Sequence, residues 1–323
     1  MYEGDQTNLT PERARHSRAL GRHGLSVLSK LPCTEPAPSN EVSTNYFTCL
    51  AAFTDPHRSW NSEGVPQTAL QLLSQLRNSL CESEAGDLLA EVLRRKVKPA
   101  FAQTNKPQPG SEAEPKPWRT QQVYMPTVLR CILQLTCLNK DERQAVGTTW
   151  FSDVDAQCNF VHANWPLLVP SMLTLLDDPS VSHKAQGCLD FSIFLSRIKG
   201  EMLVRTGLGD VFERALLPCL SNLPSLTEEQ DSIMLLNEAY PTLIKLGHVR
   251  FDGIGQRYLK IRSFDKIMQQ GILRGFSMAG EHAKIAEVLS VQGDRVVKEM
   301  GIDAAPHLKV SITSVAETAQ AIG

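Results

Sequence analysis

The stretch LLDDPSVSHKAQGCLDFSIFL, residues 175–195, decides the fold class of this chain. Leucines close one helical stripe, the turn DDPS follows at 177–180, and apolar residues then recur at steps of three and four. That spacing places one buried stripe on an α-helix. Because so short a turn separates the helices at 166–176 and 181–198, we expect them to be antiparallel neighbours. The second stripe comprises Val181, Ala185, Cys188, Phe191, Leu195 and Ile198.

Similar stripes run through most of the chain. Successive antiparallel pairs at intervals of about 40 to 50 residues are typical of HEAT or armadillo repeats, in which each pair buries its faces against the next. No convincing period-two alternation follows residue 65, so no strand is expected. The sequence therefore predicts an all-α fold, an α-solenoid of HEAT/armadillo-like antiparallel helix pairs. The other expected helices cover about 65–80, 89–97, 123–138, 211–220, 227–246, 256–276, 281–299 and, more weakly patterned, 305–321.

Several residues suggest where these helices begin, bend or end. Gly86 is expected to join the first two helices, and Pro99 to stop the second after a run of basic residues. Thr227 and Gln230 have the spacing of a capping box. Pro241 lies inside a continuing stripe, so we expect a kink there and not a break.

Composition divides the chain into two parts. Residues 1–64 are rich in Pro, Ser, Asn, Thr and Gly, so we expect a mostly disordered segment with one or two short helices. Residues 65–323 form the predicted solenoid. It is interrupted by a flexible proline-rich loop at 102–117 and by a second loop at about 139–160.

The overall balance of residues excludes some classes of function. Hydrophobic residues make up 42% of the chain and aromatic residues 6%, which suits a helical protein better than a β-sandwich. A net charge of -2 gives no case for direct binding of nucleic acid or of a membrane surface. No apolar run is long enough to span a membrane, and residues 1–10 lack the apolar region of a signal peptide. We expect an intracellular protein, both cytoplasmic and nuclear.

Metal binding is weakly supported. The eight cysteines are scattered among apolar positions, as reduced buried thiols are, and none forms a C-x-x-C pair. Cys158 and His162 lie four residues apart, and Asp153 with Asp155 forms a D-x-D, but no matching second set follows. We predict no metal and no cofactor. A metal-dependent enzyme using these four residues stays as the least favoured hypothesis.

No other pattern suggests catalysis. The chain contains no G-x-S-x-G, Walker loop or H-E-x-x-H, and the glycine pairs 207/209 and 253/255 suit helix stops better than a dinucleotide site. Asp177 and Asp178 are adjacent, so they would not face each other on a helix as acid and base. We expect them to cap the helix that follows, with His183 solvated in its first turn. The sequence thus predicts a non-enzymatic scaffold that binds proteins over an extended surface.

A family resemblance narrows this prediction. Several segments, in order, resemble fungal members of the Tti-type family, the smaller HEAT-repeat subunit of the Tel-Tti-Tti (TTT) co-chaperone complex. The similarity lies in the number and order of segments and not in any catalytic motif. The segments are VKPAFAQT (97–104), KPWRTQQVYMPTVLRCIL (116–133), NWPLLVPSMLTLLDDPSVSHKAQGC (164–188), TGLGDVFERALLPCLSNLPSLT (206–227), LLNEAYPTLIKL (235–246) and QQGILRGFSMAGEHAKIAEVL (269–289).

The resemblance implies a subunit that helps to fold and stabilise PIKK-family kinases. Its implied partners are the sister Tel and Tti subunits, those kinases and the ninety-kilodalton heat-shock chaperone system. Two departures stand out: Cys131 replaces a frequent tryptophan, and the similarity fades after Lys309, where family members continue. We therefore expect a C-terminally truncated form. HEAT patterning alone leaves another helical adaptor, of the transport-receptor or phosphatase-scaffold type, as the alternative.

Overall fold

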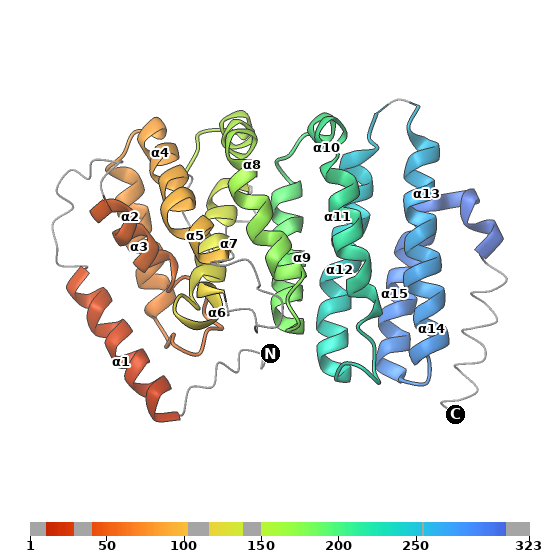
Figure 1. Ribbon diagram of the computed structural model, residues 1–323, viewed down its shortest axis with the longest axis horizontal. Helices are drawn as coiled ribbons and strands as arrows, with labels where there is room; N and C mark the ends of the chain where they lie inside the picture. Colours follow the sequence, from red (N-terminus) through yellow and green to blue (C-terminus); the bar gives the residue numbers. More distant parts are fainter. Residues whose placement is uncertain (1–10, 29–40, 103–115, 138–149, 254, 308–323) are drawn as a thin grey trace, which may run out of the picture. The chain divides into compact units, whose positions relative to one another are not determined.

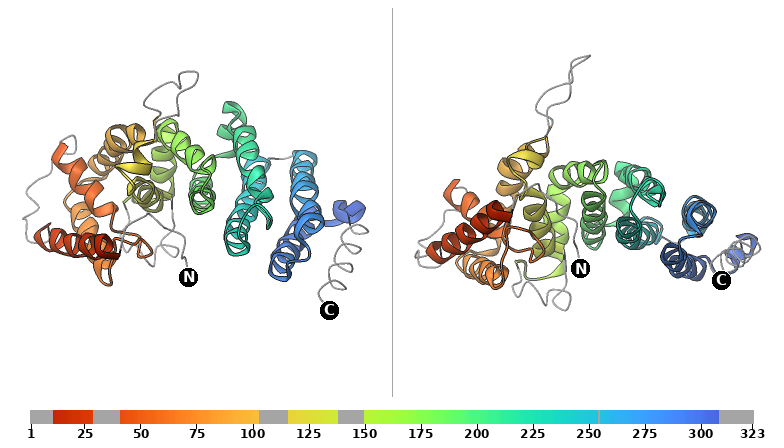
Figure 2. Two further views of the ribbon diagram at one scale, coloured as in Figure 1. Left: turned by 60° about the horizontal axis from the view of Figure 1, so that its bottom comes forward. Right: turned by 90° about the horizontal axis from the view of Figure 1, so that it is seen from below.

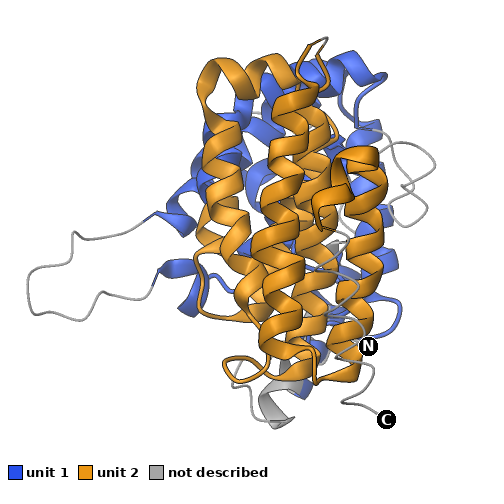
Figure 3. Cartoon of the chain, turned by 90° about the vertical axis from the view of Figure 1, so that its right-hand side faces the viewer, with its two compact units in different colours: residues 1–171 blue, residues 172–323 orange. Residues whose placement is uncertain are grey.

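The computed structural model describes residues 11–28, 41–102, 116–137, 150–253 and 255–307. Within these ranges every regular element is a helix, which confirms the predicted all-α class (Figure 1). The chain divides into two compact units, residues 1–171 and 172–323 (Figure 3). None of the helices in the described part is both long and apolar enough to cross a membrane.

The first unit is built around α2. This helix contacts α3, α4 and α7, while α1 lies against α3. Phe47 of α2 meets Trp150 edge to face, with ring centroids 5.4 Å apart, and neither side chain reaches solvent. The elements are α1 (Pro11–Leu28), α2 (Glu41–Ala51), α3 (Val65–Asn78), α4 (Glu82–Val92), a π-helix η1 (Leu93–Val97), α5 (Lys98–Phe101), α6 (Pro117–Thr120), α7 (Met125–Cys137) and most of α8 (Val154–Leu176).

The second unit is built around α12, which contacts α9, α11, α13 and α15. Figure 1 and Figure 2 show α12 beside α11, and α13 beside α15. The elements are the end of α8, α9 (Val181–Leu195), α10 (Gly200–Thr206), α11 (Leu208–Leu216), a 3-10 helix η2 (Leu217–Ser221), α12 (Glu229–Arg250), α13 (Arg257–Ile267), a π-helix η3 (Met268–Leu273), α14 (Arg274–Ala279), α15 (Ala283–Met300) and a 3-10 helix η4 (Gly301–Ala304).

The quoted stretch folds as a helix, a turn and a helix. Residues 177–180 separate the end of α8 from α9, and the predicted stripe from Ala185 to Ile198 is buried. Gly187 brings α9 close to α8, because a Cβ atom there would lie 3.0 Å from Leu176 Cδ2. The expectation for Val181 was wrong: it is only partly buried, as are the other residues of the first turn of α9.

Two predicted helix boundaries were also wrong. Gly86 lies inside α4; the first two helices are separated at residues 79–81. There the Cys81 N-H donates to Glu84 Oε2 at 2.8 Å, a reciprocal cap without the usual Ser, Thr, Asp or Asn. Pro99 does not stop its helix, because the π-turn Leu93–Val97 precedes it and α5 continues. The wider π-helical turn changes the backbone hydrogen-bonding pattern next to Pro99, which has no N-H to donate.

The prolines of the longer helices are tolerated. α8 includes Pro166 and Pro170, and both prolines are exposed. This helix begins at Val154, so the predicted loop at 139–160 extends too far toward the C-terminus. α12 continues across Pro241, so the helix does not break there, as expected.

The predicted capping box was wrong. α12 begins at Glu229, and its N-cap residue Glu228 makes no side-chain cap bond, while the Thr227 N-H donates to Leu223 O at 3.1 Å. Gly207 does end α10, with φ at 70°, whereas Gly209 lies buried within α11.

The first 64 residues contain more packed helix than their composition indicates. Thr44 and Thr48 of α2 are buried, and their hydroxyls donate to carbonyls of the same helix at 2.9 and 2.6 Å. Such internal bonds let polar residues enter a core. Arg18 of α1 donates to Ser59 O at 2.9 Å. Packed helices therefore begin before residue 65. The predicted disorder at 1–10 and 29–40, the loop at 103–115, and the weak helix beyond residue 307 lie outside the described residues.

Candidate functional site

The four residues considered for a metal lie just before α8 or in its first three turns. Asp153 Oδ1 accepts the Ala156 N-H at 2.8 Å, a helix-capping bond. Asp155 is exposed, and Cys158 and His162 are partly buried on the same helix. Within the described residues, no three His, Cys, Asp or Glu side chains come together in a group that could hold a metal ion. Asp155, Cys158 and His162 therefore share a helix, but they do not form a group of metal ligands.

Asp178, the second residue of the acidic pair before α9, stabilises the turn that leads into this helix. Asp178 Oδ1 accepts the Ser180 N-H at 2.9 Å and lies 3.1 Å from His183 Nδ1. Asp178 is only 4% exposed, whereas Asp177 is exposed. The expectation of a solvated His183 was wrong, because this buried carboxylate holds its ring. The carboxylate thus bonds the N-H of Ser180, the N-cap residue of α9.

Two cysteines meet in the second unit. Cys188 of α9 and Cys219 of η2 are both buried. Interaction with the Cys219 thiol, together with burial, raises the pKa of Cys188 well above its usual value, while interaction with the Cys188 thiol lowers the pKa of Cys219. In the first unit, burial raises the pKa of Cys131 to about 12. These thiols fill the core, as their scattered apolar positions predicted.

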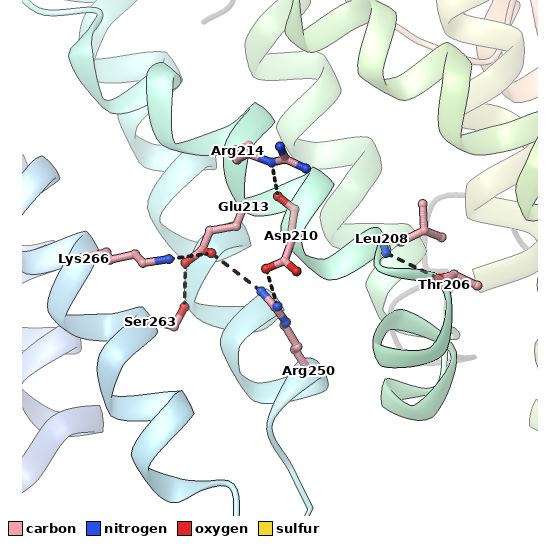
Figure 4. Close-up of polar contacts among 8 residues, drawn as sticks. All are labelled: Thr206, Leu208, Asp210, Glu213, Arg214, Arg250, Ser263 and Lys266. Atoms are coloured by element: carbon pink, nitrogen blue, oxygen red, sulfur yellow. Dashed lines mark hydrogen bonds and ion pairs between the residues drawn. The ribbon is translucent and has the colours of Figure 1, made fainter.

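The clearest polar site of the second unit centres on Glu213 of α11, whose side chain is 9% exposed (Figure 4). Lys266 Nζ of α13 donates to Oε2 at 2.9 Å, and Ser263 Oγ donates to Oε1 at 3.3 Å. Arg250 Nη1 of α12 lies 3.6 Å from Oε2, and its Nη2 donates to Asp210 Oδ1 at 2.5 Å. One buried carboxylate thus joins three helices.

A glycine makes room for this network. A Cβ atom on Gly209 would lie 2.7 Å from Arg250 Cδ, so the arginine side chain passes over a bare stretch of α11. Sequence patterns do not reveal this site, since its partners lie 40 and 53 residues apart. The amphipathic spacing of Asp210 and Glu213 was the only local signal. The network can fix the relative placement of α11, α12 and α13.

An open groove of about 500 Å³ lies in the first unit, between α4 and the beginning of α8. Glu82, Gly86 and Ala90 of α4 and Arg94 of η1 line it at intervals of four residues, on one side of the helical stretch. The Ser152 N-H donates to Glu82 Oε2 at 3.0 Å, which places the first turns of both helices at the same end. The remaining lining residues are Ser83, Asp87, Phe151, Ala156, Phe160, Ala163 and Asn164.

Comparison with known protein families identifies the family of this chain. The family model described as the Tti2 family matches residues 47–321. The match begins before the boundary expected at residue 64 and extends past Lys309, where the resemblance was expected to fade. No solved structure matches the chain.

Proposed function

This chain belongs to the Tti2 family, and on that premise we propose that it is a non-catalytic scaffold subunit of a TTT-type co-chaperone complex. In this role it would assist the folding, assembly and stability of PIKK-family kinases. Its partners would be the sister Tel and Tti subunits, the client kinases and the heat-shock chaperone machinery. It would act in the cytoplasm and the nucleus, without direct contact to nucleic acid or membrane.

The observation that carries this proposal is the extent of the family match, which covers residues 47–321 and so reaches both compact units. The helical architecture supports a scaffold role, because stacked helices offer long outer faces to partners. Three polar side chains with close hydrogen-bond partners have structural roles. Asp153 caps α8, Asp178 holds a turn, and Glu213 joins three helices.

The proposal is tested by isolating the tagged full chain from its own cells and identifying co-purified proteins by mass spectrometry. We expect both sister subunits at near-equal amounts, with PIKK-family kinases in smaller amounts. Depletion of the chain should lower the abundance of those kinases without lowering their transcripts. Recovery of a transport GTPase or a phosphatase, with neither sister subunit, would overturn the proposal in favour of another helical adaptor.

A further inference from the structure

We propose that Ser62, in the segment between α2 and α3, is a phosphorylation site, and that its phosphate is bound by Arg22 and holds α1 on the first unit. Such a modification would give the first unit a helix whose attachment is regulated. It does not depend on which complex the chain joins.

Two arginines of α1 reach the segment that precedes α3. Arg22 Nε donates to Ser62 Oγ at 3.0 Å, and Arg18 Nε donates to Ser59 O at 2.9 Å. Each guanidinium has four further N-H donors on its two Nη atoms. Among the described residues these Nη atoms have no partner. The side chain that contacts the Ser62 hydroxyl therefore keeps the donors that phosphate oxygens accept.

The charge of α1 beside this segment is positive. Arg15, Arg18 and Arg22 follow one another at steps of three and four, which places them on one side of the helix. All three are exposed, and no carboxylate of the described chain pairs with them. Glu63, directly after Ser62, is exposed and forms no ion pair with Arg22. A phosphate on Ser62 would supply the anion that this side of α1 lacks.

The helix that follows Ser62 adds to the same field. Ser62 O accepts the Val65 N-H at 3.1 Å, so the serine lies directly before the first turn of α3. That turn contains no acidic residue, and the N-cap residue Gly64 provides no side-chain cap. The positive end of the α3 dipole therefore favours a negative charge at Ser62.

α1 has little else to hold it in place. Side chains of α1 are described at residues 15, 18, 19 and 22–27, and among these Leu25 alone is buried, at 2% exposure. Val27, two residues later, is 53% exposed. One buried leucine contributes only a small part of the free energy needed to order a helix. A single charge-assisted contact at Ser62 therefore shifts the fraction of molecules in which α1 is docked.

The modification itself is a transfer from ATP. A serine/threonine kinase moves the γ-phosphoryl group to Ser62 Oγ, the bond to the β-phosphate breaks, and ADP leaves. The hydroxyl proton passes to the catalytic base of the kinase. Ser62 is partly exposed and its neighbours Glu63 and Gly64 are exposed, so the acceptor lies at the surface. The product carries a charge of about -1.5 to -2 at pH 7, directly beside Arg22.

The first test asks whether the site is used. The full chain is isolated from its own cells with phosphatase inhibitors and digested with trypsin, and the peptide 59–77 is analysed by tandem mass spectrometry. We expect phosphate on Ser62 in part of the molecules. Fragment ions distinguish Ser62 from the other hydroxyl residues of this peptide, which are Ser59, Thr68 and Ser74. Phosphate at those residues alone, or none in the peptide, would overturn the assignment.

The second test asks what the phosphate does. The full chain is produced with phosphoserine at position 62 through an expanded genetic code and compared with the unmodified chain. Hydrogen-deuterium exchange is measured on peptides from residues 11–28. We expect exchange in α1 to be about tenfold slower when the phosphate is present. Equal exchange in the two forms would contradict the role of the phosphate in docking α1.

Matched variants separate Arg22 from general charge. Arg22→Gln in the phosphorylated chain should return α1 to within about twofold of the unmodified rate, whereas Arg205→Gln on α10 should keep the full slowing. Both arginines are exposed, so thermal melting should change little. Phosphoserine at Ser290, an exposed position of α15, should leave α1 exchange unchanged. Slowing that persists in Arg22→Gln, or that phosphoserine at Ser290 reproduces, would overturn Arg22 as the phosphate-binding residue.

Discussion

Glu213 and Lys266 form an ion pair at 2.9 Å between α11 and α13, and Arg250 of α12 lies 3.6 Å from the same carboxylate oxygen. The carboxylate is nearly buried, while the lysine side chain remains 40% exposed. A buried carboxylate needs such partners, since leaving it unpaired is costly. The pairing therefore holds three helices in register.

The first prediction concerns this carboxylate. Glu213→Ala should lower the free energy of unfolding by about 2 kcal/mol, because it leaves the largely buried Arg250 with one carboxylate partner, the exposed Asp210. Lys266→Ala should cost less than about 1 kcal/mol, since a partly exposed cation gains little from pairing. Urea denaturation of both variants provides the comparison. An equal loss for the two would show that Glu213 is not the centre of the network.

The second prediction uses glycine. Gly200→Ala should destabilise the protein by about 2 kcal/mol or more, because the new Cβ atom would lie 2.2 Å from the Val249 carbonyl oxygen, and backbone cannot easily move away. Gly86→Ala is the matched control. Its nearest atom, on Phe151, would be 3.7 Å away, so the helix should gain up to about 1 kcal/mol. Differential scanning calorimetry should show a lower melting temperature for Gly200→Ala and a higher one for Gly86→Ala than for the parent protein.

The helices were predictable because their signal is local. A stripe such as that from Ala185 to Ile198 is visible in a single window of sequence. The boundaries were less predictable where an unusual local structure replaced a common one. The π-turn before Pro99 and the Cys81 cap show no distinctive residue pattern, so the helix ends predicted there were wrong.

The candidate sites were not predictable, for a different reason. Glu213 and Lys266 are 53 residues apart, and their contact depends on how α11 and α13 pack. Gly86 and Ala90 look like ordinary helix residues until α8 lies beside them. Tertiary packing creates both features, and one sequence does not reveal it.

The third prediction concerns the turn before α9. Asp178→Asn should cost less than about 1 kcal/mol, since an amide oxygen can still accept the Ser180 N-H. Asp178→Ala should cost about 2 kcal/mol, because that N-H and the ring of His183 lose their acceptor in a buried place. Thermal melting of both variants checks the order. If both substitutions cost the same, the hydrogen bond to Ser180 contributes nothing.

The fourth prediction concerns Tyr240, which is fully buried in the second unit and whose hydroxyl has no hydrogen-bond partner in the described chain. Tyr240→Phe should therefore change stability by less than about 1 kcal/mol at neutral pH, whereas Tyr240→Ala should cost about 3 to 5 kcal/mol through the cavity it leaves.

Burial also raises the pKa of Tyr240 above its usual value of 10.0. A raised folded-state pKa means that the neutral phenol stabilises the fold below about pH 10 and that this contribution is lost as the pH rises further. Tyr240→Phe should therefore reduce the alkaline loss of stability measured by urea denaturation between about pH 9 and pH 11. A variant that loses as much stability as the parent over this range would contradict the assignment.

The last prediction concerns thiol reactivity. Among the cysteines of the described residues, Cys81, which is exposed at the beginning of α4, should be alkylated first. Burial raises the pKa of Cys49, although Lys96 partly opposes this, so its thiolate is scarcer and its labelling slower. Cys131 is buried with a pKa of about 12 and should remain unlabelled until the protein unfolds. Timed iodoacetamide labelling near pH 8, read by peptide mass spectrometry, gives the order, and Cys81→Ser should remove the fastest phase alone. Native labelling of Cys131 at the rate of Cys81 would mean that the core of the first unit opens far more often than its packing implies.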